Sequence, residues 1–247
     1  MNKKYARVVS GILCLVLLIS GLVCLVRDKK NKADNMNIYE ELQDSHESIL
    51  GSVELSVEIP VDFTELKKIN QDIYAWIDIE DTNIHYPIVQ SSTDDSYYLE
   101  HTIEGKKGLP GSIYTESINL KTFQDYMTVI YGHDMKDGSM FKDLHKFSDE
   151  EFFKEHDTIM IYTENSINMY RVYAAVAYDN RHIMYSFDQN DAEERMEFIK
   201  SLREARSMRN QFRDGMEIDE DSKLVVLSTC ITGQPDKRWI VVAEECQ

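Results

Sequence analysis

The pattern of hydrophobic and polar positions divides the chain into three parts. Residues 8–26 form an uncharged run of 19 residues, which as a helix would span about 28 Å and cross a bilayer core. Residues 27–52 are polar, with few apolar positions, and short apolar segments bounded by turns follow. We therefore expect a tail over 1–7, a transmembrane anchor over 8–26, a juxtamembrane spacer over 27–52, and one folded domain over 53–247.

Short segments of strand composition dominate the folded part. They are rich in Val, Ile, Tyr and Thr, and turn residues bound them. The segments are Tyr74–Ile79, Ile84–Val89, Gly111–Tyr114, Met127–Tyr131, Thr158–Tyr162, Met169–Ala177, Lys223–Ser228 and Trp239–Ala243. Eight short strands predict a mainly β fold, either a closed barrel or a sandwich.

Helical spacing recurs in three places. Asp62 opens a capping-box pattern that predicts a helix over about 62–72, and Ser148 opens a second, shorter pattern. The longest helix is expected over about 191–208, capped by Asp191. We interpret its apolar stripe as core contact and expect no cofactor there. That stripe consists of Met196, Ile199, Leu202 and Ala205.

The charge of the chain is distributed unevenly. The whole chain has a net charge of −17, but residues 33–247 hold 20 basic and 43 acidic residues, a net of −23. Such a surface repels phosphate backbones, so we expect no nucleic-acid partner. The acidity would favour cationic or amine-bearing partners, and it also serves solubility.

The four cysteines separate into two groups. Cys14 and Cys24 lie in the predicted anchor, and Cys230 and Cys246 lie in the folded part. In an antiparallel hairpin of the last two strands, Cys246 lies about 23 Å from Cys230. A disulfide needs Cα atoms within about 7 Å. We therefore expect Cys230 to be a free thiol.

Three chemically capable side chains fall at predicted strand ends. Cys230 ends one apolar segment, a breaker loop over 231–237 follows, and Arg238 begins the last strand opposite the cysteine. His133 follows the strand that ends at Tyr131. An arginine beside a cysteine favours the thiolate, which is the nucleophilic form. By spacing alone, Cys230 also fits a buried structural cysteine, and a lone histidine also fits a polar surface position.

The motifs Tyr131-Gly-His133-Asp-Met135 and Leu227-Ser-Thr-Cys230, with Arg238 eight residues after the cysteine, together resemble the sortase family. Class B is the best match, and the resemblance covers about 60–245. Two positions differ from the common class B pattern. They are Asp134, where asparagine is common, and Val226, where threonine is frequent. Neither position is one of the three catalytic ones.

The resemblance implies a closed eight-stranded barrel with added helices, one of them inserted between the sixth and seventh strands. It implies that Cys230 is the nucleophile, His133 the acid and base, and Arg238 the oxyanion stabiliser. The implied enzyme cuts a sorting signal after its threonine and joins that threonine to an amine, without metal or cofactor. Because a thiolate and an imidazolium must coexist, we expect a bell-shaped pH–rate profile. The implied substrate-binding residues are Asp95, Leu99, Tyr131, Tyr185 and Ser228.

The implied partners are surface proteins with a C-terminal sorting signal, a peptidoglycan or precursor amine as acceptor, and the plasma membrane through residues 8–26. A single-pass protein with its catalytic domain on the extracellular face is expected. Three alternatives stay open: a pilin-polymerising sortase, a cysteine hydrolase, and a membrane-tethered binding module in which Cys230 is structural.

Overall fold

The computed structural model describes residue 30 and residues 35–45 and 59–246. The predicted anchor at 8–26 lies outside these residues. Within the described ranges, no helix combines the length and the apolar character that a bilayer crossing requires.

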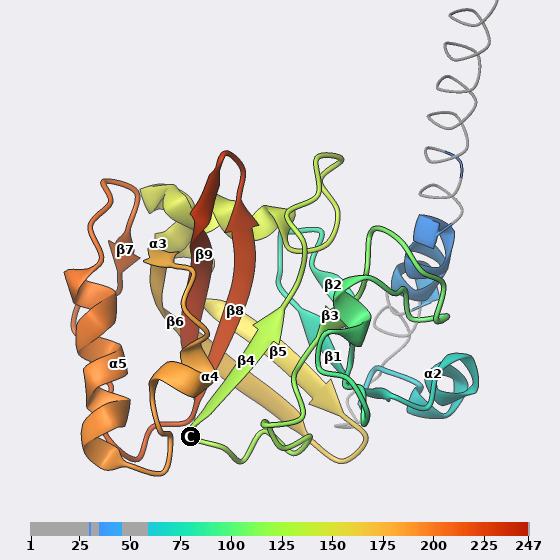
Figure 1. Cartoon of the computed structure of the whole chain (residues 1–247), viewed down its shortest axis with the longest axis horizontal. Helices are drawn as coiled ribbons and strands as arrows, with labels where there is room; N and C mark the ends of the chain where they lie inside the picture. The colour runs from blue at the N-terminus through green and yellow to red at the C-terminus, as the bar shows by residue number, and fades with distance from the viewer. Residues whose placement is uncertain (1–29, 31–34, 46–58, 247) are drawn as a thin grey trace, which may run out of the picture.

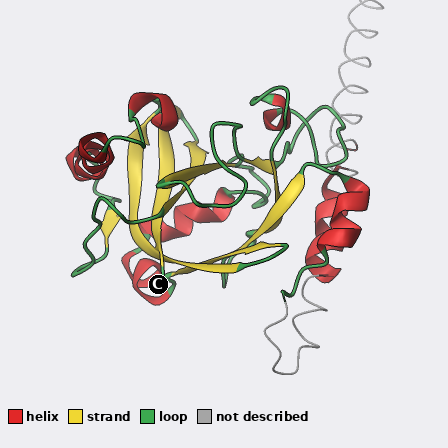
Figure 2. Cartoon of the chain, turned by 90° about the horizontal axis from the view of Figure 1, so that it is seen from below, coloured by secondary structure: helices red, strands yellow, loops and turns green. Residues whose placement is uncertain are grey.

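The predicted strands are all present and close into a barrel (Figures 1 and 2). Around the ring the order is β5-β1-β2-β3-β4-β8-β9-β6, and pairing of β5 with β6 closes it. The ninth strand, β7, pairs with β6 outside the ring. It was not predicted, because two residues are too short to show a strand pattern. The strands are β1 (Ile73–Asp78), β2 (His85–Val89), β3 (Ile113–Tyr114), β4 (Met127–Tyr131), β5 (Thr158–Thr163), β6 (Ile167–Asp179), β7 (Gln211–Phe212), β8 (Leu224–Ile231) and β9 (Gln234–Glu245).

Two pairings determine where the candidate residues lie. Strand β4 runs parallel to β8, with Tyr131 opposite Ser228, so both strands end at the same rim of the barrel. Strands β8 and β9 form the predicted antiparallel hairpin, with Cys230 directly opposite Arg238. The predicted loop over 231–237 is too long, because the strands continue to a two-residue turn in which Gly233 adopts a φ of 81°.

Helices cover the outside of the barrel (Figure 1). Asp62 caps the helix Phe63–Ile69 as predicted, and its carboxylate accepts from the amide of Glu65. The cap predicted at Ser148 is wrong, because Asp149 accepts from the amide of Phe152 and Ser148 ends the preceding 3-10 helix. The segment 183–186 is helical although no helix was predicted there. The helices are α2 (Phe63–Ile69), α3 (Glu150–Glu155), α4 (Ile183–Ser186) and α5 (Ala192–Glu204), with 3-10 turns η1 (Tyr97–Leu99) and η2 (Lys142–Ser148).

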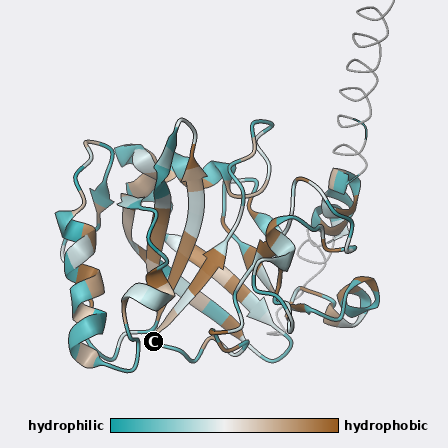
Figure 3. Cartoon of the chain, in the orientation of Figure 1, coloured by the Kyte–Doolittle hydropathy of each residue, from teal (hydrophilic) through white to brown (hydrophobic). Residues whose placement is uncertain are grey.

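The core has two parts, one inside the barrel and one between the barrel wall and helices α4 and α5. Helix α5 begins at the predicted cap, where Asp191 accepts from two backbone amides. Ile199 and Leu202 are buried as predicted, but Met196 is 36% exposed and Phe198 is fully buried. The apolar face is therefore rotated toward Phe198, and the outer face of α5 is largely hydrophilic (Figure 3).

Residues 35–45, within the predicted spacer, form a helix that packs on the barrel side. The Tyr39 ring is 1% exposed, and burial raises the pKa of its phenol to about 12. The protonated hydroxyl donates to the carbonyl of Gly111 at 2.7 Å and accepts from the amide of Ile103 at 3.1 Å. The segment 97–112, which includes η1, is thus attached to this helix.

Replacing Tyr39 with Phe should lower the free energy of unfolding by about 1–3 kcal/mol, because it leaves a buried carbonyl and a buried amide without their partner. Denaturant unfolding of the whole chain measures this change. Tyr170→Phe is the matched control, since Tyr170 is equally buried at 1% exposed and its hydroxyl has no hydrogen-bond partner among the described residues. Equal losses for both variants would contradict the prediction.

Candidate active site

Hydrogen bonds continue between β4 and β8 past the last paired residues, Tyr131 and Ser228. The amide of Gly132 donates to the carbonyl of Ser228 at 3.1 Å, and the hydroxyl of Thr229 donates to the carbonyl of Gly132 at 2.8 Å. These bonds continue the pairing up to the residue before His133 and the residue before Cys230. The two side chains therefore emerge at the same rim, although 97 residues separate the bonded pair.

Gly132 is required by space rather than by its backbone conformation. A Cβ atom there would lie 2.5 Å from Cδ1 of Ile113 and 2.7 Å from the ring of Phe141. Both neighbours are fully buried, so neither side chain can move aside without disturbing the barrel core. The glycine between Tyr131 and His133 thus lets the chain pass close to the barrel interior.

Gly132→Ala should therefore destabilise the fold by about 1–3 kcal/mol through overpacking, and the displaced His133 should reduce the catalytic rate. Denaturant unfolding and a peptide-cleavage assay test the two effects. Wild-type stability together with wild-type rate would show that the close approach is not needed.

The three candidate catalytic residues, His133, Cys230 and Arg238, line one open cavity of about 230 Å³. Cys230 is a free and exposed thiol, as expected, so a structural cysteine sealed in the core is excluded. The second body cysteine, Cys246, is also free and lies at the opposite end of β9. The lining residues are Leu99, Tyr114, Tyr131, Gly132, His133, Asp179, Asn180, Arg181, His182, Ile183, Ser228, Thr229, Cys230, Arg238 and Ile240.

The imidazole of His133 is hydrogen-bonded to the last residue of η1, Leu99. Its Nε2 lies 2.7 Å from the carbonyl oxygen of Leu99. A carbonyl only accepts, so Nε2 carries the proton in this contact. Because Nε2 is occupied by this hydrogen bond, Nδ1 is the ring nitrogen that can exchange a proton with a reacting group. A fixed ring orientation of this kind is what general acid–base chemistry requires.

The Arg238 side chain lies on the strand facing Cys230. Its Nη1 donates to the carbonyls of Pro235 at 3.2 Å and Lys237 at 2.9 Å. These carbonyls belong to its own hairpin, and the half-buried guanidinium also lines the cavity. Its planar fork has further donors for a developing anion next to the thiol.

The structure brings some of the predicted substrate-binding residues to the cavity and not others. Leu99, Tyr131 and Ser228 line it. Tyr185 lies outside the lining, is 70% exposed, and stacks on His182 at a centroid distance of 4.2 Å. Asp95 also lies outside the lining, and its carboxylate accepts from the amide of Ser117 at 2.7 Å.

Two tyrosines form a neutral part of the cavity wall. The rings of Tyr114 and Tyr131 stack with centroids 5.4 Å apart. Burial, with a smaller contribution from the Glu116 carboxylate, raises the pKa of both phenols far above the usual range. Both hydroxyls therefore stay protonated and available as hydrogen-bond donors.

The sequence analysis missed the segment from the end of β6 to α4. Asp179, Arg181 and His182 from this segment line the cavity. Nε2 of His182 lies 2.7 Å from Oε2 of Glu116, which links the segment to the residues after β3. The run of polar residues directly after a long strand was the available signal, but only Tyr185 was named from this region.

A thiol, an imidazole and a guanidinium around one open cavity supply a nucleophile, a proton carrier and an anion stabiliser. That set fits acyl transfer through a covalent thioester. Among the described residues, no group of three or more His, Cys, Asp or Glu side chains is arranged to hold a metal ion.

Comparison with known proteins gives a consistent result. A family model described as a sortase domain matches residues 77–246. A sortase B of Listeria monocytogenes is 31% identical, over 94% of this chain and 90% of the relative. Among solved structures, Clostridium perfringens sortase B superposes with a TM-score of 0.67 at 27% identity, covering 75% of this chain and all of that one. A Streptococcus pyogenes class B sortase involved in pilus biogenesis gives 0.64 at 30% identity, covering 76% of this chain and all of that one.

Proposed function

This chain belongs to the sortase family and is a cysteine transpeptidase related to class B sortases, and from that premise we propose its reaction. The enzyme cleaves a C-terminal sorting signal after threonine and transfers the cleaved protein to a cell-wall amine. The observation that carries the proposal is the placement of Cys230, His133 and Arg238 around one open cavity.

In the first half of the reaction, the Cys230 thiolate attacks the threonine carbonyl of the signal. The sulfur–carbon bond forms and the carbonyl oxygen becomes an oxyanion, which the Arg238 guanidinium stabilises. His133, as imidazolium, donates its Nδ1 proton to the departing amide nitrogen. The carbon–nitrogen bond breaks, and a thioester on Cys230 remains.

In the second half, an amine attacks the thioester carbonyl. The same guanidinium stabilises the second oxyanion, and Nδ1 of His133 accepts a proton from the attacking nitrogen. Collapse of the intermediate releases the Cys230 thiolate and forms the new amide bond. The energy of the original peptide bond is kept in the thioester, so the exchange needs no nucleotide.

The proposal includes a location. With residues 8–26 as a single-pass anchor, the barrel would lie on the extracellular face of the plasma membrane, where sorting signals and acceptor amines meet. Protease digestion of intact cells tests this orientation, because an external barrel is digested without lysis and an internal one is protected.

A second candidate function is pilin polymerisation, favoured by the Streptococcus pyogenes relative involved in pilus biogenesis. The same three side chains would serve either acceptor. A lysine side chain of a second pilin would then replace the cell-wall amine.

The test is incubation of the chain with a panel of sorting-signal peptides, with and without an added amine, followed by mass spectrometry. Cleavage after threonine, a thioester adduct on Cys230 and an amide product with the amine are expected. Supplying a cell-wall peptide in one arm and a lysine-bearing pilin peptide in another separates the two acceptors. Release of free acid alone, with no amide product from any amine, would contradict the proposed transpeptidation and favour a cysteine hydrolase.

A further inference from the structure

A buried carboxylate lies between the loop after β4, which carries His133, and the β8–β9 turn, which follows Cys230. The side chain of Asp134, the residue after His133, is only 3% exposed. Its Oδ1 accepts from Nζ of Lys142 at 2.9 Å, and its Oδ2 accepts from the hydroxyl of Thr232 at 2.7 Å. Thr232 belongs to the turn two residues after Cys230. One carboxylate therefore joins the β4 loop to the β8–β9 turn.

His145 connects the same group of residues to the backbone of Cys230. Its Nε2 lies 3.1 Å from the carbonyl oxygen of Cys230 and 3.7 Å from Oδ2 of Asp134. Burial lowers the pKa of His145, which favours the neutral ring with Nε2–H donating to the carbonyl. The ring also packs beside Trp239 of β9, with centroids 5.8 Å apart.

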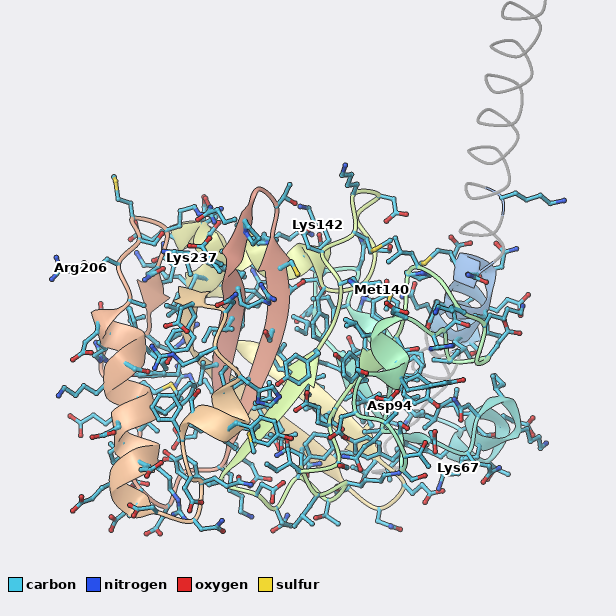
Figure 4. The ribbon with its side chains drawn as sticks, viewed as in Figure 1. Lys67, Asp94, Met140, Lys142, Arg206 and Lys237 are labelled. Atoms are coloured by element: carbon cyan, nitrogen blue, oxygen red, sulfur yellow. The ribbon has the colours of Figure 1, made fainter. Side chains whose placement is uncertain are left out.

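Asp134 is ionised in this setting. Burial by itself favours the neutral acid, but the hydrogen bonds from Thr232 and Lys142 outweigh it and lower the pKa of the carboxyl. The charge is matched by the ammonium of Lys142, which Figure 4 labels near the upper end of β8 and β9. An ionised acceptor makes both hydrogen bonds stronger than neutral ones.

The β8–β9 turn needs such an attachment. It projects from the barrel (Figure 1), its residues Thr232 and Gly233 are exposed, and the strand register shifts between Cys230 and Ile231. An exposed turn is less constrained than the strands that it joins, and a shift of this turn would displace the adjacent Cys230. Misplacing a reacting group by about 1 Å can reduce a rate by roughly 100-fold.

We propose that Asp134 is a positioning residue for the reaction: it fixes the β8–β9 turn to the His133 loop through Thr232, and so holds the Cys230 thiol in reach of the imidazole. The inference rests on the proposed function. Asp134 itself touches neither sulfur nor substrate in this role, and acts through the loop that it holds.

Three variants of the whole chain test the role. Asp134→Ala removes the carboxylate that accepts from Thr232 and Lys142. Thr232→Val removes only the hydroxyl that donates to Asp134. The double variant combines the two changes. We expect kcat to fall by roughly tenfold for Asp134→Ala and by a few-fold for Thr232→Val, with KM within about twofold of wild type. Because the hydroxyl acts through the carboxylate, the double variant should be no slower than Asp134→Ala alone.

Asp143→Ala is the matched control. Asp143 is a second carboxylate of similar burial, on η2, which accepts from the amide of Asn83 at 2.9 Å and pairs with Lys146 at 3.0 Å. It contacts neither loop of the site in these bonds, so its loss should leave kcat within about twofold of wild type.

The outcomes distinguish the two proposals. If the wild-type chain transfers no peptide, the proposed function fails. If it does transfer, a folded Asp134→Ala variant with wild-type kcat, or losses that multiply in the double variant, would overturn the positioning role. Should Asp134→Ala not fold, Thr232→Val decides: an unchanged kcat overturns the role and a few-fold loss supports it.

Discussion

Cys230→Ala should reduce peptide transfer by roughly 10⁴-fold or more, because no other group in the cavity can form the thioester. The fold should remain intact, since the Cys230 side chain is exposed and its loss leaves no cavity in the core. Transfer measured by mass spectrometry, together with the thermal unfolding midpoint, separates loss of chemistry from loss of structure.

Cys246→Ala is the control for this variant. Cys246 is the second free thiol of the described body, and burial raises the pKa of its thiol, which makes it a poor nucleophile. The Cys246→Ala enzyme should transfer at the wild-type rate, and its Cys230 should still be alkylated. Near-normal transfer by the Cys230→Ala enzyme would exclude the thioester mechanism.

Arg238→Lys should lower kcat by about 100-fold although the positive charge is kept. The guanidinium is a planar fork that can hold its hairpin carbonyls and still present a donor to the oxyanion, whereas an ammonium is a mobile point charge. The hairpin carbonyls of Pro235 and Lys237 would compete for that single charged group. Single-turnover acylation rates measure the effect on the first half of the reaction.

Arg171→Lys is the comparison for Arg238→Lys. Arg171 pairs with Asp157 at 3.0 Å, and Arg171 lines a different pocket, together with Cys246 at the far end of β9. This variant should acylate at the wild-type rate. Efficient acylation by the Arg238→Lys enzyme would mean that charge alone suffices and that the fork geometry has no role.

Much of the fold follows from local sequence pattern. Short runs rich in Val, Ile, Tyr and Thr, each bounded by turn residues, predicted all eight strands of the ring, because β-branched and aromatic side chains fit a pleated strand and turn residues end it. The caps at Asp62 and Asp191 were predictable for the same reason, since a capping side chain binds an amide two or three residues away. The pairing of Cys230 with Arg238 needed only a hairpin.

Contacts between segments far apart in the chain could be seen only in the tertiary structure. The parallel pairing of β4 with β8 puts His133 and Cys230 at the same cavity, and no local rule requires two strands so far apart in the chain to be neighbours. The attachment of Asp134 to Thr232, the bond from His133 to the Leu99 carbonyl, and the contact of Tyr39 with Gly111 are of the same kind. The sequence thus determined the strands of the ring, two of the three predicted helix caps and the reactive residue types. The closed barrel determined which of those residues meet, because only its ring order brings their strand ends to one rim.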